Sequence, residues 1–277
     1  MILGKPALME ANGMQLQNID NKVCFTINQF RTDDEIKSYR SLIEDGLISG
    51  IEIFYPNEVS KEAFLMYTEN IHLLKNMGVE VVMHLPHGKK YDLCNIQESD
   101  RVFKTMKDAI DYARQFDVKK FTLHLGYVAD IRENVISRMI PILQNLCDYA
   151  YPSAIMIENM PGISELGYSP DEILMIIKKV ERKNLKFIFD TGHAHVSEYT
   201  LTDYLTKLKP YLHHIHFNDN NGVRDEHRRI GEGTIDFTQV FAQLNEYNEL
   251  HCLEILYRTV DDIKLYYQDL SRFFKKK

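Results

Sequence analysis

Short apolar runs alternate with longer amphipathic stretches along the chain, from about Lys22 to Phe274. Eight of the apolar runs have the length of strands, and each is followed by a stretch with the pattern of a helix. The predicted strands are Val23–Gln29, Gly50–Tyr55, Val79–Leu85, Lys120–Leu125, Ala154–Asn159, Leu185–Asp190, Leu212–Asn218 and Cys252–Tyr257.

Helix-end signals and periodicity support the stretches between the strands. Apolar residues recur at three- and four-residue spacing in 99–116 and 131–150, as in amphipathic helices. Thr32-Asp33-Asp34-Glu35 resembles a capping box, and Ser169-Pro170-Asp171-Glu172 places a serine N-cap before proline and acids. The predicted helices are Thr32–Glu44, Ser60–Met77 (ending before Gly78), Ser99–Phe116, Ile131–Ala150, one that begins at Ser169, Thr200–Lys209, Asp236–Tyr247 and Val260–Phe274.

Eight strand–helix units in series predict an α/β fold with a parallel sheet and helical crossovers. Eight units in ~250 residues fit a closed (β/α)₈ TIM barrel better than an open sheet. No linker rich in Pro, Gly or Ser divides the 277 residues. We therefore expect one domain over 1–277, with the barrel itself at about 22–274 and a short N-terminal extension before it.

Composition and charge narrow the expected partners and location. The net charge is −7, so no overall positive field attracts nucleic acid, although a local basic patch stays possible. The four cysteines are far apart and form no CxxC pair, which favours reduced thiols in a cytoplasmic protein. No apolar run approaches the ~20 residues that cross a bilayer, and Met1–Met14 lacks the pattern of a signal peptide.

Histidines and acids gather where the predicted strands end, which is the edge that carries the active site in a TIM barrel. The residues are His84, His124, Glu158, Asp190, His214, His216 and Glu254. Any one of them alone is compatible with a hydrogen-bonded core residue. Six strands that end in a histidine or an acid are harder to explain in this way. Buried carboxylates such as Glu158 and Asp190 are costly unless a cation offsets their charge, so we predict a divalent metal site. The two-residue strand period puts His214 and His216 on one face, the barrel interior if His216 is a ligand.

Two loops add further candidates. Asp190-Thr191-Gly192-His193 places His193 at a predicted tight turn, and Asp225-Glu226-His227 supplies an acid–histidine pair after the seventh strand. Gly231-Glu232-Gly233 is interpreted as a turn that folds this loop over the barrel mouth. A GxSxG elbow and a GxGxxG loop are both missing from the sequence, which argues against an α/β-hydrolase and a Rossmann enzyme.

The placement of these residues resembles the xylose isomerase-like TIM-barrel superfamily. That superfamily includes sugar isomerases and epimerases, and the endonuclease IV class of abasic-site nucleases (AP endonuclease family 2). The resemblance to the epimerase branch implies one divalent ion held by Glu158, Asp190, His216 and Glu254. It also implies that Glu158 and Glu254 exchange protons with the sugar and that His193 contacts the substrate.

The endonuclease branch uses three zinc ions and more ligands. The resemblance implies that its additional positions are His84, His124, His193, Asp225 and His227. The segment Asp225–Gly233 matches the pattern D-x-H-x-x-I-G-E-G residue for residue. The first strand lacks the Gly-x-His start of those nucleases, and no basic loop interleaved with aromatic residues is suited to DNA.

The first hypothesis is therefore a Zn²⁺- or Mn²⁺-dependent isomerase or epimerase of a small sugar or sugar phosphate, acting through an enediolate. It assigns catalysis to Glu158 and Glu254 and substrate binding to His193, Arg229 and His84. The alternative is an abasic-site endonuclease or phosphodiesterase with up to three ions. A ligand-binding barrel without turnover and a lyase are further hypotheses, and the sequence leaves the sugar and the oligomeric state open.

Overall fold

Eight parallel strands close into a barrel in the computed structural model, which describes residues 22–27, 33–244, 246–257 and 259–272. The strands follow one another around the barrel in chain order, and the last pairs with the first. They are β1 Val23–Ile27, β2 Gly50–Phe54, β3 Glu80–His84, β4 Lys120–Leu123, β5 Ala154–Glu158, β6 Leu185–Asp190, β7 Leu212–Phe217 and β8 His251–Leu253. The predicted TIM barrel is confirmed.

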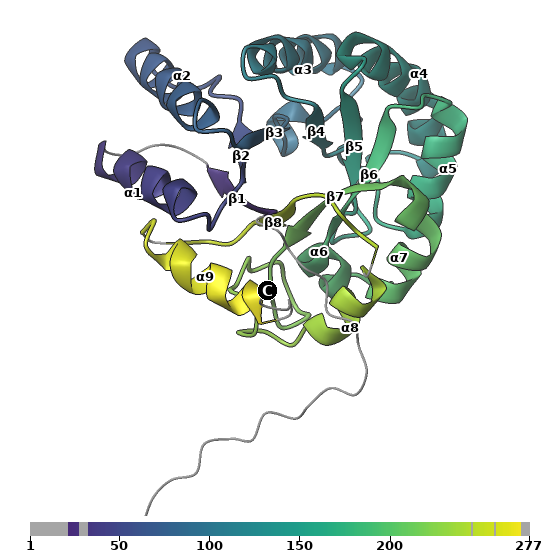
Figure 1. Cartoon of the computed structure of the whole chain (residues 1–277). Coiled ribbons are helices and arrows are strands. Elements are labelled where there is room, and N and C mark those ends of the chain that lie inside the picture. The colour runs from purple at the N-terminus through teal and green to yellow at the C-terminus, as the bar shows by residue number, and fades with distance from the viewer. Residues whose placement is uncertain (1–21, 28–32, 245, 258, 273–277) are drawn as a thin grey trace, which may run out of the picture.

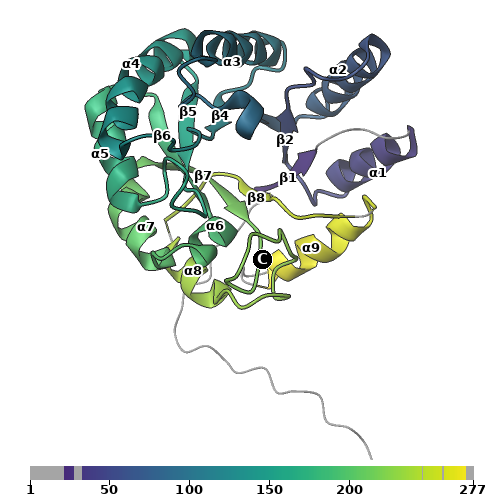
Figure 2. The same cartoon turned by 180° about the vertical axis from the view of Figure 1, so that it is seen from behind.

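Helices form an outer ring around the strands, as both views of the molecule show (Figure 1, Figure 2). They are α1 Asp33–Glu44, α2 Lys61–Lys75, α3 Ser99–Arg114, α4 Arg132–Ala150, α5 Pro170–Val180, α6 Thr191–Val196, α7 Leu201–Leu208, α8 Phe237–Gln243 and α9 Asp262–Ser271, with 3₁₀ turns η1 Lys89–Tyr91 and η2 Lys209–Tyr211. No helix in the described part of the chain is long and apolar enough to span a membrane.

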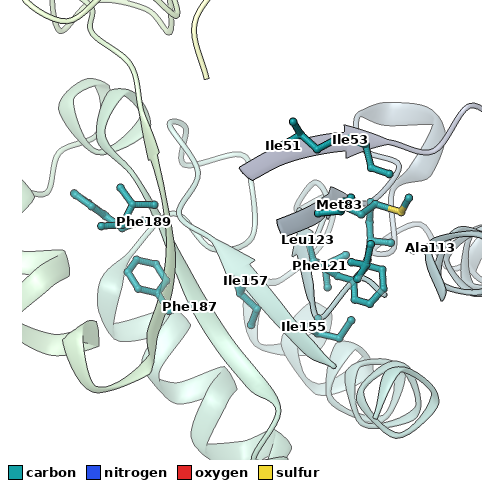
Figure 3. Close-up of a cluster of buried hydrophobic side chains, with 14 of the residues drawn as sticks. Ile51, Ile53, Met83, Ala113, Phe121, Leu123, Ile155, Ile157, Phe187 and Phe189 are labelled. Carbon is teal, nitrogen blue, oxygen red and sulfur yellow. The ribbon is translucent and has the colours of Figure 1, made fainter. Parts of the chain in front are cut away.

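Strand parity decides which side chains face the helices and which fill the barrel. Alternate residues such as Ile51 and Ile53 of β2, and Phe187 and Phe189 of β6, belong to the large apolar layer between strands and helices (Figure 3). The other parity points inward, where the apolar residues form a separate cluster of Cys24, Val82, Ala154, Met156, Ile188, Leu250 and Cys252. Buried polar residues also point inward: Glu52 pairs in register with Val82, and His214 with Ile188.

Local signals were accurate where a side chain could cap a helix. The hydroxyl of Ser169 accepts a hydrogen bond from the Glu172 amide at 3.1 Å, which begins α5 as predicted. The predicted tight turn after Asp190 is wrong: Asp190 instead caps the short helix α6, accepting from the His193 amide at 2.6 Å. The eighth strand ends at Leu253 rather than Tyr257. The N-terminal extension lies outside the described residues, and so does Thr32, the first residue of the predicted capping box.

Candidate metal centre

The inward-facing residues at the carboxyl ends of the strands converge on one region of the barrel mouth. His84 ends β3, Glu158 ends β5, Asp190 ends β6 and His216 lies one residue before the end of β7. Asp190 and His216 are partners in the β6–β7 register. Because they share parity and strand end, side chains far apart in sequence meet around common points.

A central donor set consists of Glu158, Asp190, His216 and Glu254, whose ligand atoms all lie within 4.8 Å of one another. Nδ1 of His216 is 3.0 Å from Oε1 of Glu158 and 3.1 Å from Oε2 of Glu254. It is 4.0 Å from Oδ2 of Asp190. Glu254, which follows β8, is 16% exposed, whereas the other three are almost fully buried. This is the ligand set that the epimerase resemblance implied.

A second donor set, His84, His124 and Glu158, shares its carboxylate with the first. Nε2 of His124 lies 2.9 Å, and Nε2 of His84 3.5 Å, from Oε2 of Glu158. Nδ1 of His84 lies 2.8 Å from the carbonyl oxygen of Leu85, so it donates its proton there. That bond leaves the Nε2 lone pair of His84 turned toward the centre, as a metal ligand requires.

The third donor set, His193, Asp225 and His227, comes from α6 and the loop after β7. Oδ2 of Asp225 lies 3.3 Å from Nε2 of His193 and 2.8 Å from Nε2 of His227. Both imidazoles donate from Nδ1 to backbone carbonyls, His193 to Asn159 at 2.8 Å and His227 to Glu254 at 2.9 Å. The other oxygen of Asp225, Oδ1, is buried without a hydrogen-bond partner, which suits a metal ligand.

The electrostatics of the central set favour a bound cation. Ion pairs to Lys or Arg are absent from Glu158, Asp190 and Glu254 within the described ranges of the chain. Burial raises the pKa of Asp190 to about 7, with His193 opposing and Glu158 reinforcing the shift. Burial alone would lower the pKa of His216, but the surrounding carboxylates, Glu254 first, hold it well above its ordinary value.

The donor chemistry fits a divalent ion. Mixed imidazole and carboxylate ligands are those that Zn²⁺ and Mn²⁺ accept, and separations of about 3–4 Å between donor atoms suit first-row metal–ligand bonds of about 2 Å. A cation would offset the mutual repulsion of the buried carboxylates.

Neighbouring polar side chains hold the candidate ligands in place. The side-chain amide of Asn218 donates to Oδ2 of Asp190 at 2.7 Å. Asn159 donates to the backbone carbonyl of Asp190 and accepts from its amide. A Cβ on Gly192 would lie 1.8 Å from Oδ1 of Asn218, so only glycine allows this approach of α6 to the ligand's partner.

The mouth of the barrel opens beside the central set. A cavity of about 170 Å³ is lined by His87, His227 and Glu254 together with Phe54 and neighbouring residues. Phe54 also borders a second cavity of about 550 Å³, between β2, α2 and η1. Glu254 is therefore the carboxylate of the central set that borders open space.

Arg229 and His195 do not join the centre. The guanidinium of Arg229 forms an ion pair with the buried Asp269 of α9 and lies over the ring of Tyr266. The guanidinium of Arg229 is thus already paired in the structure, and its substrate-binding role stays a prediction. Nε2 of His195 instead lies 2.8 Å from the hydroxyl of Thr234.

A buried carboxylate, that of Asp219, holds the predicted turn at 231–233. Oδ2 of Asp219 accepts from the amides of Gly231 and Gly233, both at 2.9 Å. This fixes the loop that carries Asp225 and His227.

The sequence prediction missed Glu52, which is fully buried at the centre of β2. Its signal is an acid at an inward position of the apolar strand Gly-Ile-Glu-Ile-Phe.

Comparison with known proteins identifies the family of this barrel. The family model described as xylose isomerase-like TIM barrel matches residues 48–277. The chain belongs to this family. An uncharacterised protein of Methanocaldococcus jannaschii is 34% identical over 182 residues, which cover 61% of each chain.

Other members of the xylose isomerase-like family carry functional names. A probable endonuclease 4 of Mycoplasmopsis pulmonis is 26% identical over 174 residues, covering 56% of this chain and 61% of its own. The matches thus span less than two thirds of the length of the Methanocaldococcus jannaschii protein and of the endonuclease. A solved D-tagatose 3-epimerase-like protein is 26% identical with a TM-score of 0.71, covering 90% of this chain and 96% of its own. The family therefore includes both an epimerase-like and an endonuclease-like relative of this chain.

Proposed function

We propose that this protein is a divalent-metal-dependent enzyme that isomerises or epimerises a small sugar or sugar phosphate. The observation that carries the proposal is that Glu158 and Glu254 reach the same imidazole nitrogen of His216, at 3.0 and 3.1 Å. Two carboxylates beside one ion position are what proton removal and return next to a carbonyl require. The ion would supply Lewis-acid polarisation of the substrate oxygens.

The two carboxylates have different access to a substrate. Glu254 borders the mouth cavity, so we assign it the removal of the proton next to the carbonyl. The second oxygen of Glu158 accepts a hydrogen bond from His124. We therefore assign the return of the proton to Glu158 acting with His124. His193, buried between Asp190 and Asp225, would orient a substrate hydroxyl.

Charge and space around the mouth support a small substrate. Several cations of the surrounding loops are paired with acids: Lys90 with Glu58, and both Arg224 and Arg228 with Glu226. Paired cations offer little to the phosphates of a duplex, on which DNA affinity depends. The adjoining cavities of about 170 and 550 Å³, which share Phe54, together suit a small molecule. The likeness to a D-tagatose 3-epimerase-like protein over 90% of the chain supports a sugar.

Hydrogen exchange at carbon tests the proposal directly. Metal-loaded protein in D₂O should place deuterium next to the carbonyl of its substrate in a panel of ketoses and ketose phosphates, followed by proton NMR. Glu254→Gln should lose this exchange. Glu249→Gln, which alters the partner of Lys120 at the opposite end of the barrel, should retain it. No exchange by the metal-loaded wild type on any member of the panel would count against an isomerase.

A second candidate, hydrolysis of a phosphodiester, is favoured by one specific observation. Nine residues form three donor sets side by side, and Glu158 belongs to two of them. Several ions would activate water and stabilise the leaving oxygen. The likeness to a probable endonuclease 4 supports this candidate, whereas the paired cations at the mouth do not.

Counting ions separates the two candidates. Elemental analysis and anomalous diffraction of the purified protein should show one tightly held ion in the central set if it is an isomerase. Three ions together with nicking of a duplex that contains an abasic site would favour hydrolysis. A single ion without nicking would dismiss hydrolysis.

A further inference from the structure

Glu52 is a fully buried carboxylate inside the barrel, on the side of His216 away from the central donor set. Its Oε2 lies 2.6 Å from Nε2 of His216 and 3.3 Å from Nε2 of His214. The thiol of Cys252 donates to the same oxygen at 3.4 Å. Its Oε1 accepts from the hydroxyl of Thr122 at 2.8 Å. Glu52 thus accepts hydrogen bonds from four side chains on three strands of the barrel, β4, β7 and β8.

The two nitrogens of His216 face different surroundings. Nδ1 faces the carboxylates of Glu158 and Glu254, where an ion would bind, and Nε2 faces Glu52. A nitrogen that binds a metal must present its lone pair. The single proton of the neutral imidazole then resides on Nε2, and at 2.6 Å Glu52 is its acceptor. The carboxylate therefore selects the tautomer and fixes the ring plane.

The surroundings of Glu52 require it to be a carboxylate anion. All four neighbours donate hydrogen bonds to it. The added proton of a neutral Glu52 would therefore point at another donor instead of at an acceptor. Within the described ranges, its ion pairs are with histidines, and none is with Lys or Arg. An ion bound on the Nδ1 side of His216 would supply the positive charge that offsets this buried anion.

We propose that Glu52 is a positioning residue of the metal centre, which holds His216 with Nδ1 toward the ion and strengthens it as a ligand. A carboxylate behind a histidine ligand does this in metal sites generally. The inference deepens the proposed function and rests on its ion in the central set. It holds for either reaction, because both need that ion.

A separate ion between these side chains is the competing interpretation. Donor atoms of Glu52, His214, His216 and Cys252 lie within 4.8 Å of one another. The 2.6 Å contact between Glu52 and His216 is a hydrogen-bond distance, shorter than two ligands of one ion normally approach. Hydrogen bonds account for every contact of Glu52, so we assign it to positioning.

Metal affinity of Glu52→Gln tests the inference without reference to turnover. The amide keeps the size of the side chain but cannot accept from all four donors. We expect Zn²⁺, measured by competition with a chelator, to bind roughly 10–100-fold more weakly. Thr122→Val is the matched control: it removes the bond to the other oxygen of Glu52 and should change the affinity by less than about 3-fold.

A spectroscopic measurement separates positioning from general damage. In the zinc-loaded wild type, nitrogen-15 NMR should show the proton of His216 on Nε2, with a strongly downfield hydrogen-bonded resonance. Glu52→Gln should move this resonance upfield or broaden it, and Thr122→Val should leave it in place. Circular dichroism would verify that both variants are folded. If Glu52→Gln does not fold, Glu52→Asp, which keeps the charge but withdraws it from His216, serves instead and should weaken binding.

The outcomes distinguish the inference from the proposed function. A wild type that binds no ion in the central set would overturn both. A wild type that binds an ion, with equal affinity and an unchanged resonance in Glu52→Gln, would overturn the positioning role and leave the enzyme proposal standing. Loss of an additional ion between Glu52 and Cys252 would show that Glu52 is a ligand, which also overturns positioning.

Discussion

Nε2 of His124 lies 2.9 Å from Oε2 of Glu158. The other oxygen of Glu158 faces His216, so this one carboxylate joins two donor sets. Glu158 is the carboxylate shared by the central set and the set of His84 and His124, and its neutralisation should therefore affect both.

Glu158→Gln should abolish turnover, by at least about 10²-fold, while the protein still folds. The amide removes a negative charge from two donor sets and places a donor where a ligand is needed. Metal content by elemental analysis and activity in the same preparation would measure this. Glu249→Gln is the control, and wild-type activity in Glu158→Gln would refute the assignment.

Removing one candidate ligand from each of two sets should show which set holds the tightly bound ion. Asp190→Asn should lose the tight ion, because Asp190 belongs to the central set. His227→Gln should keep that ion within about 3-fold in affinity, since it removes only a ligand of the third set. Chelator competition would compare the two, with His195→Gln as a control outside the donor sets. Equal losses in both variants would show that the sets act as one unit.

Gly192→Ala should weaken the centre without touching a ligand. The new Cβ would clash with Oδ1 of Asn218, which must withdraw from Asp190. We expect metal affinity to fall by roughly 10-fold and stability by about 1–3 kcal/mol. Chelator competition and urea unfolding would measure the two effects. In the Asn218→Ala background, Gly192→Ala should lower metal affinity and stability much less. Equal losses in that background would show that the strain arises at another contact of the new Cβ.

His251 should make the fold sensitive to acid. It is 2% exposed and stacks on Phe217 with ring centroids 5.7 Å apart. Burial lowers the pKa of His251 to about 4. The unfolded chain takes up this proton near pH 6.5 and the folded chain only near pH 4. Its stability contribution is therefore present above pH 6.5 and is lost as the pH falls toward 4, by up to about 3 kcal/mol.

His251→Phe should remove that part of the pH dependence. Urea unfolding of wild type and variant, both treated with chelator, would be compared at pH 8 and pH 4.5. The stability difference between the two proteins should shift in favour of the variant at the lower pH. Parallel curves would mean that His251 titrates alike in the folded and unfolded chains.

The sequence predicted the barrel because each of its signals is local. Alternating parity within β5 and β6 makes Glu158 and Asp190 inward-facing strand ends, whatever the rest of the chain does. The same logic applies to Glu52 in β2, but one acid in a five-residue apolar strand has no partner visible in sequence. Its importance appears only when β7 brings His214 and His216 against it, more than 160 residues away.

The sequence by itself determined the strand–helix alternation and the residue types at the strand ends, because both depend on periods of two and about 3.6 residues. Only the tertiary structure decided how the donors divide into sets, which oxygen of Glu158 faces His124, and that Arg229 turns to Asp269 on α9. Those relationships depend on barrel closure and strand register. Such long-range geometry is set by the packing of the whole core rather than by any one segment.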